Sequence, residues 1–150
     1  MTVPQIDYAA VYRQLPIPVV LLTPELVIAD ANEAYVQTTG RAREELLGRT
    51  IPDAFPDDPA DPRASGARNV SASVHHVLAT GERAALEFQR YDVEVSPSLF
   101  ARRYWSAVNA PVSGPDGSVV LIAGCLEDVT DRMRRFMSVL EADAEDDKPG

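Results

Sequence analysis

Two β-prone runs joined by a tight turn constrain the fold of this chain more than any other feature. The runs cover residues 104–112 and 118–126, and the Gly, Pro and Asp residues of positions 113–117 supply the backbone angles that a turn requires. The sequence therefore predicts a long β-hairpin, which continues directly through residues 127–131 into a terminal helix.

The inner face of this hairpin is expected to be a mixed surface. Side chains alternate along a strand, so every second residue lies on the same face. The residues concerned are Trp105, Ala107 and Asn109 in the first strand, and Val120, Ile122, Gly124 and Leu126 in the second. A buried indole N–H and a buried amide both need hydrogen-bond partners. This mixture favours the wall of a pocket over a plain core.

Length and charge limit the class of protein and its partners. The chain has 150 residues, of which 45% are hydrophobic, and this fits one globular domain with tails. A formal net charge of −9 makes nucleic acid and membrane surfaces poor partners. The sequence contains no apolar run of about 20 residues and no secretory signal at its start, so we expect a cytoplasmic protein.

The cysteine content excludes two kinds of site. Cys125 is the one cysteine of the sequence, so the chain holds neither an internal disulfide nor a zinc site built on cysteines. Its position inside a predicted strand favours a small buried hydrophobic residue.

The first half of the chain is predicted to contain short elements. A helix over residues 6–15 has an apolar stripe and ends before two prolines, and strands are expected at 19–22 and 26–29. Asp30 or Asn32 is expected to cap a helix that begins at Glu33 and ends near Gly40. Residues 43–48 form a further helical turn.

The second half begins with a proline- and aspartate-rich surface loop at 56–66. A helix over 67–80 follows, with Val70, Val74, Val77 and Leu78 on its core side, and Gly81 ends it. Residues 86–95 alternate as one strand, and either of its two faces could point inward. Residues 97–103 are expected to be a loop.

Several of these segments, taken in order, resemble a PAS domain. They are NEAY at 32–35, ELLG at 45–48, Gly81, the Gly117 turn and EDVTD at 127–131. The resemblance covers residues 16–131. It implies an α+β fold with a five-stranded antiparallel sheet, short helices on one face, and N- and C-terminal flanking helices. Around this sensor domain we expect the amphipathic helix within 1–15, a signalling helix at 132–142 and an acidic disordered tail at 143–150.

Further motifs are similar to those of a bacterial PAS subgroup found in sensor histidine kinases of two-component systems and in related regulators. They are RNV at 68–70, QRYD at 89–92 and YWSAVNAP at 104–111. The resemblance implies a sensory cavity. This subgroup carries basic residues just before its EDVT ending, where this chain has Gly124 and Cys125, so its ligand is expected to differ.

The cofactors of PAS photoreceptors and haem sensors can be tested against the sequence. Covalent flavin chemistry needs a cysteine after the second strand, and residues 52–63 contain none. Haem sensors use a histidine on the long helix, where His75 and His76 lie; His76 is expected at the border of the inner face and His75 outside it. No cofactor is therefore assigned, with a haem sensor as a distant alternative. The sequence shows no catalytic constellation, so we expect a regulatory domain and not an enzyme.

The leading hypothesis is a sensor that binds a small molecule and signals to an output domain. Its expected pocket residues are Tyr35, Asn69, Ser73, His76, Arg90, Trp105, Asn109, Ile122 and Gly124. If Arg90 points inward, its partner is an anionic or carbonyl-bearing ligand, or an acid such as Asp92. The alternative is a ligand-free dimerisation module, and the position of Trp105 distinguishes the two hypotheses. If its indole forms a wall, a pocket of a few hundred Å³ is expected; if the indole fills the cavity, no room is left for a ligand.

The terminal helix is expected to transmit the signal within a parallel-type homodimer. Its apolar stripe needs a partner surface, and the helix is expected to end near Ala142. The alternative is a monomer whose terminal helix covers its own sheet. The expected dimer and signalling residues are Tyr8, Val11, Tyr12, Leu15, Asp128, Thr130, Met133, Phe136, Met137 and Leu140.

Overall fold

A five-stranded antiparallel sheet with strand order β2-β1-β7-β6-β3 organises the chain. It is seen in a computed structural model that describes residues 1–147. The strands of this sheet are β1 (Val19–Leu22), β2 (Ile28–Ala31), β3 (Ala84–Arg90), β6 (Tyr104–Ser113) and β7 (Val119–Asp128). The long β6–β7 hairpin lies at the middle of the sheet, and the predicted α+β fold is confirmed.

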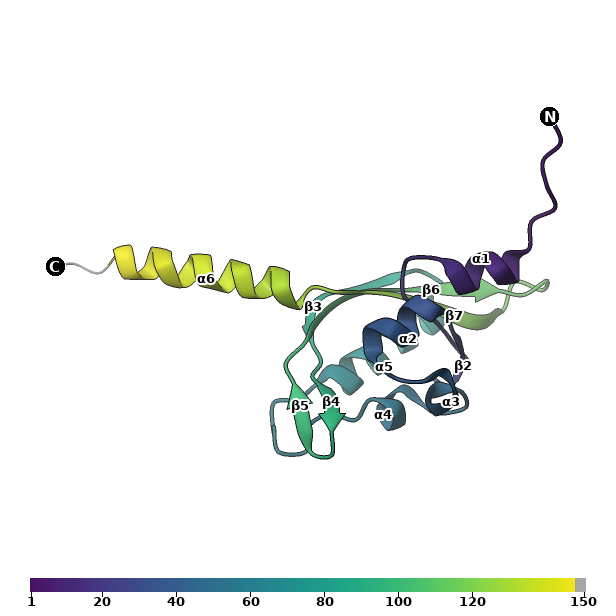
Figure 1. Ribbon diagram of the computed structural model, residues 1–150. Coiled ribbons are helices and arrows are strands. Elements are labelled where there is room, and N and C mark those ends of the chain that lie inside the picture. Colours follow the sequence, from purple (N-terminus) through teal and green to yellow (C-terminus); the bar gives the residue numbers. More distant parts are fainter. Residues whose placement is uncertain (148–150) are drawn as a thin grey trace.

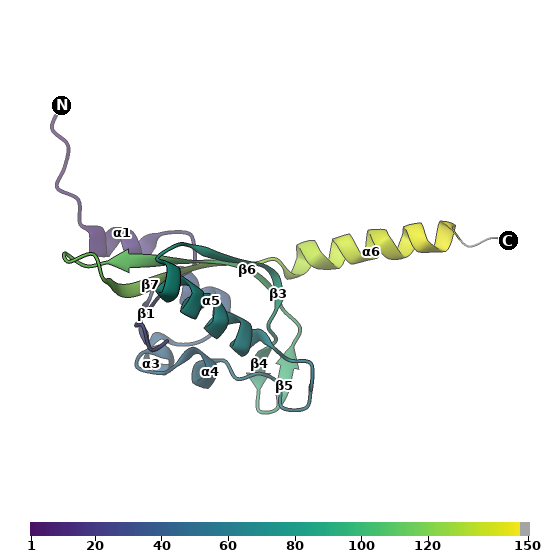
Figure 2. The same cartoon turned by 180° about the vertical axis from the view of Figure 1, so that it is seen from behind.

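Four helices cover one face of the sheet, and the core lies between them and the strands (Figure 1 and Figure 2). These helices are α2 (Glu33–Thr39), α3 (Arg43–Leu46), α4 (Ile51–Ala54) and α5 (Gly66–Thr80). Leu22 and Ile122 from the sheet are fully buried, as are Leu46 from α3 and Val74 from α5. The Val70, Val74, Val77 and Leu78 stripe predicted for α5 does pack against this core.

The amide of Asn32 joins three segments at the entrance to the fold. Its Oδ1 accepts from Val19 N at 2.9 Å and from Tyr35 N at 3.0 Å, which starts β1 and caps α2. Its Nδ2 donates to the carbonyls of Ile17 and Tyr12. All the hydrogen-bonding capacity of this buried side chain is therefore directed at backbone groups. Asn32, rather than Asp30, is the cap of α2.

The second strand begins two residues later than expected. Leu26 adopts a left-handed conformation with φ of 64° and donates its N–H to Thr23 O, so it belongs to the turn. The strand predicted at 26–29 is therefore β2 at Ile28–Ala31. The presence of a second strand was predicted correctly from its apolar residues. The turn before it, however, extends beyond Thr-Pro-Glu at residues 23–25 and includes Leu26.

The single strand predicted over 86–95 is wrong. β3 ends at Arg90, and β4 (Val93–Ser96) pairs instead with β5 (Leu99–Ala101), which lies in the predicted loop at 97–103. β3 also contains an irregularity between Leu86 and Gln89, where Phe88 has φ of 50°. An extra residue in a strand reverses the face of every later side chain.

The outer face of the sheet explains two further differences. Cys125 is exposed, because its partner across the ladder is Val108 and both point away from the helices. The prediction that Cys125 is buried is therefore wrong. Val120 is also exposed, since the register shifts between Val112 and Ser113 and removes it from the face of Ile122.

The two terminal helices differ in their attachment. α1 (Tyr8–Gln14) buries no residue, although its Tyr12 carbonyl holds the Asn32 amide. α6 (Thr130–Asp146) extends away from the sheet as a free-standing helix (Figure 1), so it does not cover its own sheet. It ends four residues beyond the predicted Ala142, because the Glu- and Ala-containing sequence there has good helix propensity. The last part of the predicted tail, 148–150, lies outside the described residues.

Within residues 1–147, no helix has both the length and the apolar composition needed to cross a bilayer.

Replacing Asn32 by Ala is expected to lower the free energy of unfolding by about 2–4 kcal/mol, because buried backbone donors and acceptors lose their partners. Asp7→Ala removes an exposed cap of α1, whose Oδ1 accepts from Ala10 N at 3.0 Å, and should cost about 1 kcal/mol or less. Urea denaturation measures both. Equal losses in the two variants would contradict the central role of Asn32.

Candidate functional site

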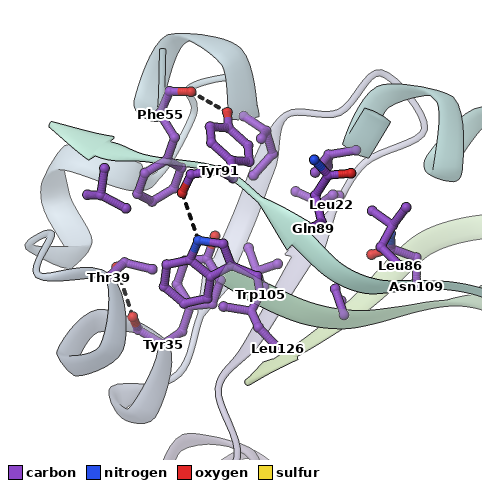
Figure 3. A pocket seen from close by; sticks show the side chains of 16 residues that line it. Leu22, Tyr35, Thr39, Phe55, Leu86, Gln89, Tyr91, Trp105, Asn109 and Leu126 are labelled. Atoms are coloured by element: carbon purple, nitrogen blue, oxygen red, sulfur yellow. Dashed lines mark hydrogen bonds between the residues drawn. The ribbon is translucent and has the colours of Figure 1, made fainter. Parts of the chain in front are cut away.

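A cavity of about 80 Å³ lies between the inner face of the sheet and helices α2, α4 and α5 (Figure 3). Its walls come from every part of the fold except α1, α3, β2, β5 and α6. The lining residues are Val20, Leu22, Tyr35, Thr39, Ile51, Phe55, Val70, Leu86, Gln89, Tyr91, Val93, Trp105, Ala107, Asn109, Gly124 and Leu126. None of these side chains is charged at neutral pH, so the cavity is an apolar, electrically neutral space.

The β6–β7 register places the wall residues of the hairpin. Ala107 pairs with Leu126 and Asn109 with Gly124, and all four face the cavity. Gly124 leaves room that a larger residue would occupy: a Cβ there would lie 3.0 Å from Asn109 Oδ1 and 3.1 Å from Val20 Cγ1. The absence of a side chain at this position therefore keeps the Asn109 amide oxygen uncovered.

Trp105 forms a wall of the cavity and does not fill it. Its indole N–H donates to Tyr91 O at 2.9 Å, and the hydroxyl of Tyr91 donates in turn to the carbonyl of Phe55 (Figure 3). Gly66 lies under the Tyr91 ring, where a Cβ would meet ring carbons at 2.3 Å. The predicted surface loop at 56–66 therefore ends in a buried glycine that fixes this aromatic wall.

Other polar wall groups are held by protein partners. Asn109 Nδ2 donates to Ser73 Oγ at 3.0 Å, and Asn69 Nδ2 donates to Gln89 Oε1 at 2.8 Å. Ser73 and Asn69 both belong to α5, so this helix orients the two amides of the sheet. Since the amides are fixed from behind, they present defined atoms to the cavity.

Tyr35 is the most buried polar side chain of the wall. It is 3% exposed, and its ring meets Phe55 edge to face with centroids 6.3 Å apart. Burial raises the pKa of the Tyr35 phenol, so the hydroxyl stays neutral at physiological pH. Among residues 1–147, no protein group forms a hydrogen bond with this hydroxyl, which leaves it available to a bound molecule.

The structure brings some of the predicted pocket residues together and separates others. Tyr35, Trp105, Asn109 and Gly124 line the cavity. Asn69 and Ser73 stand behind the wall and orient Gln89 and Asn109. Ile122 packs in the core without lining the cavity.

The inward placement of Arg90 is wrong. The irregularity at Phe88 turns Gln89 toward the cavity, so the next residue, Arg90, points outward. Its guanidinium lies 2.9 Å from Asp92 Oδ2 and 3.8 Å from Asp61 Oδ2, in a separate crevice on the surface. Asp92 was among the partners expected for Arg90, but the pair lies outside the cavity and not within it.

His76 does not reach the cavity either. Both His75 and His76 are exposed on α5, because Ser73, Val74 and Val77 occupy its buried side. The border position expected for His76 is therefore wrong, and neither histidine is placed to bind a haem in this cavity.

Most of the apolar wall was missed by sequence reasoning. Phe55, Leu86, Tyr91 and Leu126 line the cavity, but periodicity identifies such residues only as part of a core. The QRYD motif contained the one pattern that could have predicted wall residues, because Gln89 and Tyr91 are two residues apart and both face inward. The alternation of that strand alone does not indicate which of its two faces points inward.

The predicted signalling residues lie along the edge of the domain and on both terminal helices. Thr130 is buried and Asp128 supports it, whereas Tyr8, Val11, Leu15, Phe136, Met137 and Leu140 are exposed and Met133 is half-buried. Burial raises the pKa of Tyr12 to about 12, and its buried hydroxyl has no partner within residues 1–147.

Known structures with the same fold come from signalling proteins. The PAS domain of BvgS from Bordetella pertussis has a TM-score of 0.58 at 22% identity, covering 89% of this chain and 93% of that chain. A sensory box sensor histidine kinase from Vibrio cholerae has a TM-score of 0.55 at 19% identity, covering 82% and 89%. No curated protein matches the sequence.

The regulator VqmA of Vibrio cholerae, whose structure is described for a dimer, has a TM-score of 0.64 at 20% identity. The match covers 87% of this chain and 53% of that chain, so this chain spans about half of VqmA. Another VqmA structure, with a TM-score of 0.59 at 18% identity over 83% of this chain and 57% of that chain, is of the protein bound to DPO. A family model described as the PAS fold matches residues 12–134, and the chain therefore belongs to the PAS family.

Proposed function

We propose that this chain is a PAS sensory module that binds a small uncharged molecule in its cavity. The bound state is relayed through α6 to a regulatory output, such as a kinase, a phosphatase or a transcription regulator. The observation that carries this proposal is a shared strand: β6 supplies both the Trp105 wall of the cavity and the backbone that holds the start of α6.

The relay consists of short contacts at the end of the hairpin. Tyr104, which precedes Trp105, donates its N–H to Thr130 Oγ1 at 3.0 Å and accepts from Val129 N at 2.9 Å. Asp128 Oδ1 accepts from Thr130 N at 2.9 Å. A displacement of Trp105 by a ligand would therefore move the backbone to which the first turn of α6 is bonded.

The cavity indicates the chemistry of the ligand. Its walls carry no charge to neutralise an anion, and this favours an uncharged molecule over an anionic one, which was one of the partners expected for an inward Arg90. The Tyr35 hydroxyl and the Asn109 amide oxygen offer one or two hydrogen bonds. The cavity volume of about 80 Å³ is below the ~300 Å³ of the smallest pockets that hold drug-sized ligands. The ligand is therefore small, or the wall residues move apart to admit it.

The proposed assembly is a homodimer, and the domain itself is a regulator without catalysis. Phe136, Met137 and Leu140 expose an apolar stripe on α6 that needs a partner surface. The description of VqmA as a dimer supports this arrangement by analogy. A downstream signalling domain or protein would receive the output.

The small volume of the cavity favours a second candidate function. In this alternative, the domain binds no ligand and serves to dimerise and hold a partner. The hydrogen bonds that already engage Trp105, Tyr91 and Gln89 suit a wall that is complete without a ligand.

Ligand binding is tested by filling the cavity. Ala107→Leu adds side-chain volume on the inner face of β6, and Ala110→Leu adds the same volume on the opposite face. Native mass spectrometry of protein purified from bacterial cells should find a small molecule on the wild type and on Ala110→Leu, and none on Ala107→Leu. A wild type without any adduct would favour the ligand-free module, and an adduct kept by folded Ala107→Leu would reject the cavity as the binding site.

The relay is tested by Thr130→Val, which keeps the shape of the side chain and removes its hydrogen bonds to Tyr104 and Asp128. Ligand affinity should change by less than about threefold, whereas protection of the first turn of α6 from hydrogen exchange should stop depending on ligand. Ser138→Val, which removes a hydroxyl bonded to Arg134 O further along α6, should retain the dependence. Retained dependence in Thr130→Val would remove this relay.

The dimer is tested by Phe136→Asp in sedimentation at micromolar concentration. The wild type should sediment as a dimer and Phe136→Asp as a monomer, because a charge on the apolar stripe prevents its burial. Ser138→Asp is the control: Ser138 is also exposed but lies about 160° around the helix from Phe136. A monomeric wild type, or a dimeric Phe136→Asp, would reject the proposal.

A further inference from the structure

α6 is a helix that no other part of the described chain covers. It leaves the sheet at Thr130, its one buried residue within Thr130–Asp146, and stands clear of the domain in both views (Figure 1 and Figure 2). Phe136 is 60% exposed and Leu140 is 52% exposed. A helix of this length with an apolar stripe is marginal in water when it is alone, so it needs a partner.

The charges of α6 are separated along its axis. Arg132, Arg134 and Arg135 occupy the first half, beside one acid, Asp131, and the second half carries Glu141, Asp143, Glu145 and Asp146. Acidic side chains near a helix C-terminus oppose the helix dipole, and no basic residue lies in the last turn. The acidic half of the isolated helix is therefore the end that gains most from nearby positive charge.

The same charges flank the apolar stripe. At about 100° per residue, Met133, Met137, Leu140 and Ala144 fall on one face. Arg132 and Asp143 lie on one edge of that face, and Arg134 and Glu141 lie on the other. Each edge thus begins with a basic residue and ends with an acidic one.

We infer that α6 pairs with α6 of a second copy in an antiparallel orientation. In such a pair, the edge with Arg132 and Asp143 faces the same edge of the partner helix, which runs in the opposite direction. The edge with Arg134 and Glu141 does the same. Arginines of one helix therefore face acids of the other along both edges. The register that places Met137 against Leu140 also places Met133 against Ala144. A parallel pair, the orientation expected from the sequence, would set arginines against arginines and acids against acids.

The arginines that this pairing uses are accessible. Arg132 Nη2 lies 2.8 Å from Glu127 Oε1, and Arg134 Nη1 lies 3.6 Å from Asp131 Oδ1, but both ion pairs are solvent-exposed. Exposed pairs contribute little stability, so the arginines can exchange these partners for acids of the second copy. The two sensor domains would then stand at opposite ends of the paired helices. This inference rests on the homodimer proposed above and specifies its geometry.

Disulfide trapping tests the orientation directly. In a Cys125→Ser background, chains carrying Met133→Cys are mixed with chains carrying Ala144→Cys under mild oxidation, and each chain is also oxidised alone. Antiparallel pairing gives the mixed disulfide and little of either homodisulfide. A Met133→Cys homodisulfide in preference to the mixed product shows a parallel pair, and the absence of any trapped dimer shows no pair; both results overturn the inference.

Charge reversal provides a second measurement. Arg132→Glu with Arg134→Glu makes the helix acidic, and Glu141→Lys with Asp143→Lys makes it basic. Each double variant should dimerise at least about tenfold more weakly than wild type, while an equimolar mixture of the two, or one chain with all four changes, should recover the wild-type affinity.

The basic variant is the informative one, because it brings the net charge of the chain closer to zero. If overall repulsion alone governed association, this variant would dimerise more tightly; a tighter dimer overturns the inference. A protein that carries a ligand in native mass spectrometry but remains monomeric overturns the antiparallel pair and leaves the sensory function intact.

Discussion

The ladder between β6 and β7 is the interaction on which the rest of this structure depends. Its register pairs Asn109 with Gly124, which creates the open part of the cavity wall. The same register turns Cys125 and Val108 outward and brings Trp105 opposite Asp128, two residues before Thr130. One set of backbone hydrogen bonds thus determines the wall, the outer face and the base of α6. If the register between β6 and β7 slipped by one residue, inward side chains would turn outward, and the wall, the outer face and the base of α6 would all change together.

The sequence predicted the elements whose signals are local and failed where one residue changed the backbone path. Asn32, Gly40 and Gly81 mark helix ends by side-chain or left-handed backbone chemistry, and the structure has them there. Phe88, by contrast, adopts φ of 50°, a conformation that its sequence does not suggest. That one residue reversed the face of Arg90 and brought Gln89 and Tyr91 into the cavity. The anionic or carbonyl-bearing partner expected for an inward Arg90 therefore gave way to the proposal of an uncharged ligand.

The cavity itself was harder to predict than the fold. Alternation in the hairpin found Trp105, Asn109 and Gly124, because a polar or absent side chain interrupts an apolar face. Phe55, Val70 and Leu86 carry no such mark, since a residue that faces a void and one that faces a packed neighbour have the same hydrophobic pattern. Whether a core is filled depends on side-chain volumes summed across several helices and strands, and this information is not periodic.

The neutral cavity also determines how a signal would travel. A charged ligand would act through ion pairs, but the ion pairs of Arg90 and Arg43 lie on the surface, away from the wall. A molecule bound among Tyr35, Phe55 and Trp105, as proposed, would act instead by packing, because a packed interior is nearly incompressible and transmits displacement. Trp105 is fixed by Tyr91 O on its side chain and by Tyr104 along its backbone. In the proposed relay, displacement at the wall would pass to the strand end that holds α6, and the exposed surface of that helix is where the domain would report it.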